Sequence, residues 1–394
     1  KKINKKPTPD LYLPKILWLK NNEEDIFLKC WKFLGPSDFL AYKFCSEVIT
    51  DSFSASKFFY DYEEKKYPEK LIEKLKINLK LFPNVGTIGQ EIGEVRSEIF
   101  SHKNLNYNAK IILSTYDALC SVIGSGVTEP GDVCDVSGTV TSIRLLTEKK
   151  VVDPLARIDT QHWFNGWIIG GSNNLGGGLI EWARQLLYSK ENYKSVYKNM
   201  EKEAANISLG AEGIIFLPYL LGERAPLWND KARGVFFGLD RSHKRPQMMR
   251  SVFESTAFVS YSIIEAMKSL GLEIKQVKVS GGLAQIDLVS QLKANMFNVP
   301  VTVQNEFEST ALGAFILTSE NAKKIGFSEF FDQIDNEKKV FYPVEEDYLC
   351  QSQLYELYKS LYSNLEGIFD KKDQYYKALK NIKNKKIHSV LENL

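Results

Sequence analysis

The chain has 394 residues, 44% of them hydrophobic and 25% charged, with 51 Lys and Arg against 49 Asp and Glu. This length exceeds one ordinary core and favours two domains, while the net charge of +2 provides no overall field for binding nucleic acid or an anionic membrane surface. The composition therefore predicts a folded protein that binds a small molecule, with no nucleic-acid or membrane partner.

The cysteines are scattered and show no spacing typical of a metal site, so we expect reduced, mostly buried thiols at Cys30, Cys45, Cys120, Cys134 and Cys350. No apolar run reaches the roughly 18 residues that a membrane span needs. The first residues lack the pattern of a secretion signal. A cytoplasmic location is expected.

The first third has helical character. Residues 14–44 repeat apolar side chains at helical spacing, and Gly35 to Asp38 ("GPSD") supply a stop, a proline turn and a new N-cap. Two helices are predicted there.

From Ala109 the pattern becomes β-like. "AKIILS" (109–114) predicts one strand, and "GDVCDVSGTVTSIRLL" (131–146) predicts two strands joined by a turn. We place a domain junction near Glu129 to Asp132.

The remaining chain alternates between helices and strands. A glycine-rich entry at 170–178 leads into a helix, 218–226 forms a loop, and a long helix runs from Pro246 to Leu270 with Gly271 beyond its end. A strand (273–280), a Gly-Gly turn, a helix (284–298), a strand (299–304) and a helix (309–319) follow. This order predicts an α/β unit with a parallel sheet.

Three features are candidates for chemistry. Asp117 follows the apolar strand, where open α/β sheets place ligands, and is either a proton acceptor or a helix cap. Ser137, Gly138 and Thr139 form either a phosphate-binding turn or a plain hairpin turn. Gly281 and Gly282 either admit a ligand to the backbone at a helix N-terminus or form only a tight turn.

Other motifs are excluded or open. No GxxxxGK[ST] motif occurs, and no GxGxxG follows a strand, which sets aside a P-loop enzyme and a nicotinamide-dependent dehydrogenase. The role of "GGSNNLGGG" (170–178) is open between lining a pocket and close helix packing. The histidines are isolated and predict no metal site: His102, His162, His243 and His388.

Several longer motifs occur in a specific order. "PKILWLKNN" (14–22) and "DSFSAS" (51–56) precede Asp117 and the Ser-Gly-Thr turn, and "GERAPLWNDKARG" (222–234) and "GVFFGLDRSHKRPQMMRSVFE" (234–254) precede the Gly-Gly turn. In these motifs and their order, residues 10–365 resemble the FGGY family of carbohydrate kinases.

The resemblance implies an α/β fold with two actin-like ATPase (ribonuclease H-like) domains and an active site in the cleft between them. Residues 1–129 would be the remainder of the N-terminal domain, 130–365 the C-terminal, nucleotide-side domain, and 366–394 a helical or frayed tail. The family's opening strand hairpin with a Gly-x-Asp-x-Gly-Thr-like motif is not found here, so the first domain is expected to be incomplete and the chain a fragment of a longer kinase.

Site roles follow from the same resemblance. Asp117 corresponds to the catalytic base, and Ser137, Gly138 and Thr139 correspond to the turn that holds the phosphates of ATP. Gly281 and Gly282 correspond to the turn on the adenosine side, and Ser242 stands where some members place a nucleotide-contacting glycine. ATP and Mg²⁺ are the implied cofactors, and the metal ligands are not identified.

The implied function is ATP-dependent phosphorylation of a primary hydroxyl of a ketose or polyol, most similar to xylulokinases. L-Ribulose, gluconate, glycerol and erythritol remain open as substrates, and family habit suggests a homodimer. The alternative is a catalytically incapable remnant that binds nucleotide or a protein partner.

Overall fold

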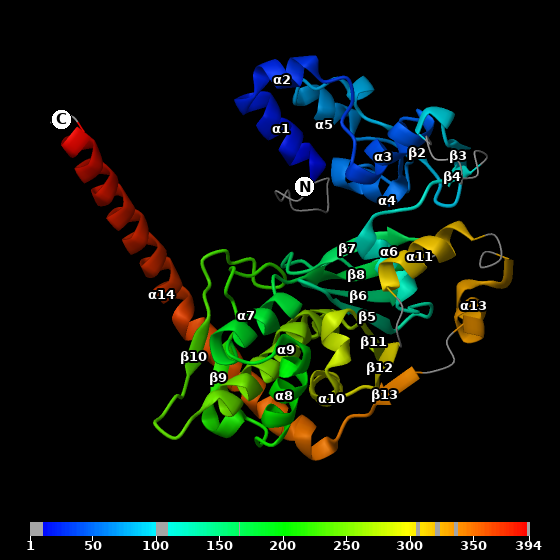
Figure 1. The fold of residues 1–394 in the computed structure, drawn as a ribbon. Coiled ribbons are helices and arrows are strands. Elements are labelled where there is room, and N and C mark those ends of the chain that lie inside the picture. The colour runs from blue at the N-terminus through cyan, green and yellow to red at the C-terminus, as the bar shows by residue number, and fades with distance from the viewer. Residues whose placement is uncertain are drawn as a thin grey trace. The chain divides into compact units, whose positions relative to one another are not determined.

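The computed structural model describes residues 11–99, 109–164, 166–304, 308–319, 324–334 and 338–391 (Figure 1). Contacts divide the chain into a first unit of Lys1–Pro130, Leu146–Ile168 and Glu306–Glu337, and a second unit of Gly131–Leu145, Ile169–Asn305 and Lys338–Leu394. Each unit therefore consists of three separate stretches of the chain, which alternate along the sequence. The assignment of functional domains to 1–129, 130–365 and 366–394 therefore stays a prediction.

The first unit is mainly helical, with four short strands before Asp117. Strands β1 and β2 pair in parallel, and β3 and β4 pair antiparallel. Its elements are α1 (Tyr12–Asn22), α2 (Glu24–Lys29), α3 (Pro36–Cys45), β1 (Ile49–Asp51), α4 (Ser52–Ala55), α5 (Glu69–Lys74), β2 (Asn84–Gly86), β3 (Glu91–Glu94), β4 (Lys110–Ile112), α6 (Asp117–Gly124), β7 (Asp159–Trp163), α11 (Ser309–Thr318) and α13 (Phe327–Ile334).

The prediction of two helices over 14–44 is wrong, because the structure has three. Glu23 adopts a non-helical conformation (φ −137°, ψ 57°) that separates α1 from α2. The break before Pro36 is confirmed, but the capping detail differs. Asp38 is the third helical residue of α3, and its carboxylate accepts a hydrogen bond from the N–H of Gly35, the N-cap residue (2.9 Å).

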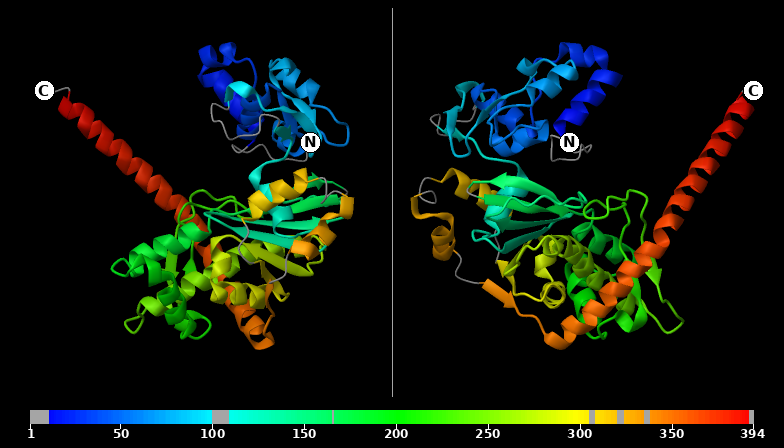
Figure 2. Two further views of the ribbon diagram at one scale, coloured as in Figure 1. Left: turned by 45° about the vertical axis from the view of Figure 1, so that its right-hand side comes forward. Right: turned by 180° about the vertical axis from the view of Figure 1, so that it is seen from behind.

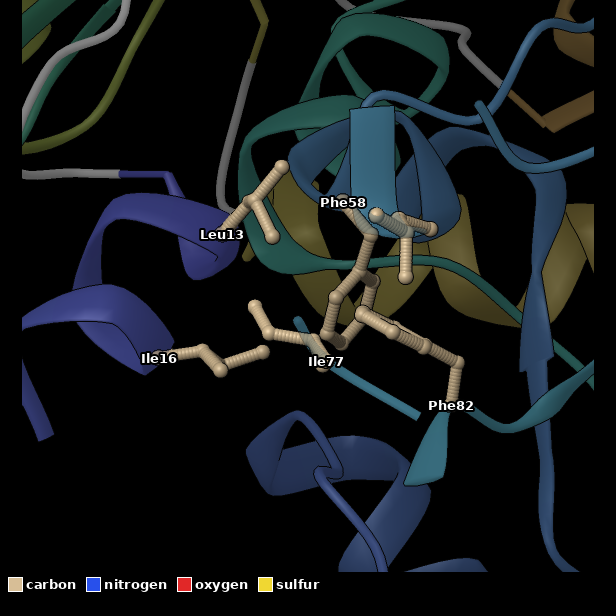
Figure 3. Packing of buried hydrophobic residues seen from close by; sticks show 6 residues of the cluster. Leu13, Ile16, Phe58, Ile77 and Phe82 are labelled. Atoms are coloured by element: carbon tan, nitrogen blue, oxygen red, sulfur yellow. The ribbon is translucent and has the colours of Figure 1, made fainter. Parts of the chain in front are cut away.

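A small hydrophobic core joins α1 to the residues around α5. Figure 3 shows Leu13 and Ile16 on α1 facing Phe58, Ile77 and Phe82. The rings of Phe58 and Phe82 meet edge to face with centroids 5.2 Å apart, which is a favoured aromatic geometry. This cluster fixes α1 beside the segment that follows α4.

Helices α6 and α11 approach each other at their glycines. A Cβ on Gly313 would lie 1.8 Å from the carbonyl oxygen of Cys120, and one on Gly124 would lie 1.6 Å from that of Ser309. These separations are below any real contact, so only glycine allows the two backbones to touch. The contact holds the helix that begins with Asp117.

The second unit contains most of a seven-stranded sheet in the order β13-β12-β11-β5-β6-β8-β7 (Figure 1). Strand β11 is parallel to both β5 and β12, as the strand–helix–strand pattern predicts, whereas β5–β6 and β12–β13 are antiparallel. The strands are β5 (Asp132–Ser137), β6 (Thr141–Thr147), β8 (Gly166–Ser172), β11 (Gln276–Ser280), β12 (Val301–Gln304) and β13 (Lys338–Phe341), with a separate pair β9 (Ile215–Leu217) and β10 (Val235–Phe237).

Helices of the second unit gather on one face of this sheet (Figure 1, Figure 2). They are α7 (Gly177–Leu187), α8 (Tyr193–Ala205), α9 (Arg245–Ser269) and α10 (Asp287–Phe297). The long helix predicted at 246–270 is thus confirmed, and Gly271 beyond its end has the positive φ of 75° expected there.

The last helix, α14 (Glu345–Leu391), belongs entirely to the second unit, and its C-terminal part projects away from the rest of that unit (Figure 2). Its Tyr358 is buried and shares a 2.6 Å hydrogen bond with the hydroxyl of Tyr219, and Tyr355 donates to Glu265 of α9. The tail predicted at 366–394 is helical as far as Leu391.

Within the described ranges, no helix is both long and apolar enough to span a bilayer. All five cysteines are free, which agrees with reduced thiols. The expectation that they are mostly buried is wrong, because only Cys120 and Cys134 are buried.

Replacing Gly313 tests the contact between α6 and α11. Gly313→Ala is expected to lower the free energy of unfolding by about 2 kcal/mol or more, because the new methyl group forces the backbones apart. Urea unfolding followed by circular dichroism measures the change.

Gly367→Ala is the matched control, since an added Cβ there meets nothing within 4 Å inside α14. Alanine should leave stability unchanged or raise it by about 0.5–1 kcal/mol. Equal stabilities of the two variants would show that the close contact is not required.

Candidate functional site

Asp117 lies where the sequence predicts, after β4 and at the start of α6. It is exposed, and one carboxylate oxygen accepts a 2.7 Å hydrogen bond from the N–H of Ala118. Tyr116 is the N-cap residue of α6, and Asp117 is the first helical residue. The alternative that Asp117 is the N-cap is therefore wrong. An exposed carboxylate at this place is available to a ligand.

The turn that carries Asp117 is tied to a buried carboxylate. The hydroxyl of Thr115 donates to Asp51 (2.9 Å), and the same oxygen caps α4 by accepting from the N–H groups of Phe53 and Ser54 (2.8 and 3.1 Å). Burial raises the pKa of the Asp51 carboxyl, and these donors oppose the rise. The "DSFSAS" motif therefore has a structural role in holding the Asp117 turn.

Lys57 is a neighbour of Asp117 that the sequence analysis missed. Its ammonium lies 3.8 Å from the ring centroid of Tyr116 and 5.4 Å from that of Tyr12. Burial lowers the pKa of Lys57, while the negative charges of Asp117 and Asp51 oppose that shift. A partly buried cation among aromatic rings thus shares the environment of Asp117.

A cavity of about 700 Å³ opens in the same unit. Gln161 on its wall donates to Ser56 (3.2 Å) and to the hydroxyl of Tyr116 (3.0 Å), which links the wall to the Asp117 turn. Tyr62 and His162 stack on another part of the wall with ring centroids 3.5 Å apart. The volume of this cavity and its mixture of polar and aromatic side chains suit a small molecule.

The predicted turn at 137–139 is a β-hairpin. Ser137 pairs with Thr141 as the last step of the β5–β6 ladder, and Gly138, Thr139 and Val140 are exposed at the tip. The backbone N–H groups and the Thr139 hydroxyl at such a tip form a suitable place for phosphate oxygens.

The Gly281–Gly282 turn lies directly against this hairpin. Gly281 has φ 87°, and a Cβ there would lie 2.5 Å from the carbonyl oxygen of Ser137 and 3.2 Å from the N–H nitrogen of Gly138. The helix predicted at 284–298 is confirmed as α10, but it begins later than predicted, at Asp287, because a 3₁₀ turn at Gly282–Gln285 comes first. The structure thus brings two predicted segments together without a helix N-terminus between them.

Residues 170–178, whose role the sequence leaves open, contact the same hairpin. The N–H of Gly177 donates to the carbonyl of Gly138 (2.6 Å), and a Cβ on Gly176 would lie 2.5 Å from that oxygen. Asn173 also exchanges hydrogen bonds with the backbone of Thr141. The segment packs against the hairpin and holds it from the second side.

Glu223 and Arg224 hold that segment in turn. One oxygen of Glu223 accepts from the N–H of Asn174 (2.8 Å), and the guanidinium of Arg224 donates to the carbonyl of Asn173 (2.9 Å). Burial raises the pKa of Glu223 to about 7, against the backbone donors and the Arg224 charge. Only their place in the "GERAPLWN" motif pointed to them.

Ser242 does not join the hairpin. It lies in the exposed segment before α9, where its N–H and hydroxyl both donate to Asp240 (2.7 and 2.6 Å). In the part of the chain that is described, no three His, Cys, Asp or Glu residues are placed to hold a metal ion.

The buried Glu223 predicts a pH-dependent stability. Its folded-state pKa of about 7 exceeds the ordinary value of 4.5, so its contribution is fully present below pH 4.5 and is lost as the pH rises through 7. The loss amounts to about 3 kcal/mol. Glu223→Gln, which cannot ionise, should match the wild type near pH 4.5 and be the more stable protein at pH 8.

Urea unfolding of both proteins from pH 4.5 to 8 measures this difference. Parallel stability profiles over that range would contradict a raised pKa at Glu223.

Comparison with known proteins matches two regions of the chain to one family. The model of the FGGY family of carbohydrate kinases, N-terminal domain, matches residues 8–124, and that of the C-terminal domain matches residues 136–321. The first match contains Asp117, and the second contains the hairpin, Ser242 and both turn glycines.

Individual relatives match over most of the chain. A xylulose kinase of Staphylococcus xylosus is 27% identical over 360 residues, covering 89% of this chain and 72% of the relative. A gluconokinase of Bacillus licheniformis is 27% identical over 384 residues, covering 94% and 74%. The crystal structure of a ligand-bound xylulose kinase from Lactobacillus acidophilus gives a TM-score of 0.84 at 28% identity, covering 92% and 74%.

These matches confirm the resemblance and the fold class inferred from the sequence, a two-domain actin-like architecture. The chain is a member of the FGGY family of carbohydrate kinases.

Proposed function

We propose that the protein transfers the γ-phosphoryl group of ATP to a primary hydroxyl of a ketose or a related polyol or sugar acid. The observation that carries this proposal is the close fit of the Gly281 turn against the Ser137–Thr141 hairpin, which leaves an exposed tip of backbone donors. Xylulose kinases and gluconokinases among the relatives support a sugar as acceptor.

Asp117 acts as the general base in this proposal. Its exposed carboxylate accepts the proton of the sugar hydroxyl as that oxygen bonds to the γ-phosphorus and the bond from phosphorus to the β-phosphate oxygen breaks. The Thr115–Asp51 hydrogen bond keeps the turn in place during the transfer. Orientation is a large part of catalysis, because phosphoryl transfer demands positioning more than covalent chemistry.

Gly138 and Thr139 bind phosphate oxygens through backbone N–H groups and the Thr139 hydroxyl, and Gly281 and Gly282 line the adenosine side. When bound with ATP, Mg²⁺ would neutralise negative charge on the phosphates that Gly138 and Thr139 hold. Residues 1–129 and 130–365 serve as the sugar-side and nucleotide-side domains.

A coupled ADP-release assay with Mg²⁺ tests the proposal on pentuloses, hexuloses, gluconate and polyols. The 394-residue chain and the chain as encoded from its start codon are compared. ADP release that depends on one sugar supports the kinase and identifies the acceptor. ATP binding without turnover on any acceptor would instead favour the non-catalytic, nucleotide-binding alternative.

Asp117→Ala is expected to lower kcat for the best acceptor by about 100- to 10,000-fold, because the proton acceptor is lost. The Kd for ATP should change by less than about twofold, since Asp117 has no part in the hairpin. Glu345→Ala is the matched control, because Glu345 is also an exposed acid at the first position of a helix. Unchanged turnover of Asp117→Ala would remove Asp117 from the mechanism.

Thr139→Val removes one hydroxyl from the hairpin tip at nearly constant volume. The loss of a hydrogen bond to a charged phosphate should raise the KM for ATP by about tenfold. The KM for the sugar serves as internal control and should stay within about twofold. A KM for ATP equal to that of the wild type would make the Thr139 side chain irrelevant to nucleotide binding.

A further inference from the structure

An ion pair lies buried beneath the tip of the β5–β6 hairpin. Lys293 of α10 and Asp135 of β5 are both fully buried, and the ammonium donates to one Asp135 oxygen at 2.6 Å. Lysine and aspartate are almost never found fully buried unless they are paired. The pair joins two elements whose residues are 158 positions apart in the chain.

Ser137 connects this pair to the hairpin. Its hydroxyl donates to the other oxygen of Asp135 (2.7 Å) and accepts from the Lys293 ammonium (3.1 Å). A serine hydroxyl has a single hydrogen, so in the 3.0 Å contact between Ser137 and Thr141 the donor is Thr141. The two residues that close the hairpin are therefore held in one hydrogen-bond arrangement by Lys293 and Asp135.

Stability alone is a poor reason for such a pair. An apolar pair of similar volume is often as stabilising as a buried ion pair or more so, because removing two charges from water is costly. What the pair provides here is fixed geometry. Asp135 and Ser137 lie on the strand that leads into the tip, and Lys293 lies on the helix that follows the Gly281–Gln285 turn.

We propose that Lys293 and Asp135 are positioning residues that, through Ser137, hold the β5–β6 hairpin against the Gly281 turn in the geometry that binds ATP. This inference rests on the proposed function. Neither residue needs to touch the nucleotide, since both lie beneath the tip formed by Gly138, Thr139 and Val140.

The test replaces the pair by apolar side chains of similar volume, Asp135→Leu with Lys293→Met, in the full-length chain. The KM for ATP is expected to rise at least fivefold, while the KM for the sugar and the melting temperature stay close to the wild-type values. A merely structural pair would not separate the two KM values.

The chain offers a control pair whose aspartate lies on the same strand, β5. Lys278 of β11 and Asp132 of β5 also form an ion pair (3.0 Å), but at the end of β5 away from the hairpin. Asp132→Leu with Lys278→Met should leave the KM for ATP unchanged. A folded Asp135→Leu/Lys293→Met variant with unchanged KM for ATP, or an equal rise in the control, would overturn the proposal.

Ser137→Ala provides a second test that leaves the ion pair intact. It should also raise the KM for ATP, and adding it to Asp135→Leu/Lys293→Met should give no further rise, because both act through one hydroxyl. An unchanged KM in Ser137→Ala, or additive effects, would overturn the positioning role even if the paired variant did not fold. Failure of the wild-type protein to bind ATP would overturn the proposed function as well, which separates the two outcomes.

Discussion

Backbone contact without intervening side chains is the constraint on which the arrangement around the β5–β6 hairpin depends. The hairpin at Ser137–Thr141 is touched on one side by Gly281 and on the other by Gly176, each at a distance that excludes a Cβ. Gly281 also needs its positive φ. Three segments distant in the chain thus meet through main-chain atoms, and the polar groups between them can be arranged only because no side chain separates them.

Around this contact the structure builds successive supports. Asn173 exchanges hydrogen bonds with Thr141, and Glu223 and Arg224 hold the Asn173–Asn174 backbone. Below the hairpin, Lys293 and Asp135 hold Ser137. The first unit uses the same device on a smaller scale, since Asp51 both caps α4 and accepts from Thr115 next to Asp117. In each case a buried carboxylate fixes a turn.

Sequence patterns predicted local features well. The β5–β6 hairpin, the long helix at 245–269 and the strand before Gly281 follow from alternation, helical spacing and glycine position. Sequence patterns were less reliable for the residues at which helices begin and end, as at Glu23 and at the 3₁₀ turn before α10, because caps and local backbone breaks determine those boundaries. The order of motifs identified the family, because a fold preserves such order more strictly than any single residue.

The buried contacts that hold these turns in place could not be predicted from the sequence. Lys293 lies in an amphipathic helix where periodicity places charged residues on the solvent face, and only its partner 158 residues earlier explains why it is buried. Lys57 likewise has an ordinary sequence context, and its relation to Asp117 appears only when Tyr12 and Tyr116 enclose it. Long-range pairing of this kind leaves no trace in local spacing.

The single hydrogen of Ser137 has a consequence for how this hairpin tolerates change. Because that hydrogen is committed to Asp135, the hydroxyl faces inward as part of the scaffold, and the exposed part of the turn is its tip at 138–140. The hairpin therefore has an inner set of polar side chains at 135, 137 and 141, where variation alters the framework, and an exposed tip at 138–140, where variation leaves that framework in place. In the proposed kinase, changes that alter nucleotide binding without disturbing this framework are confined to the exposed tip.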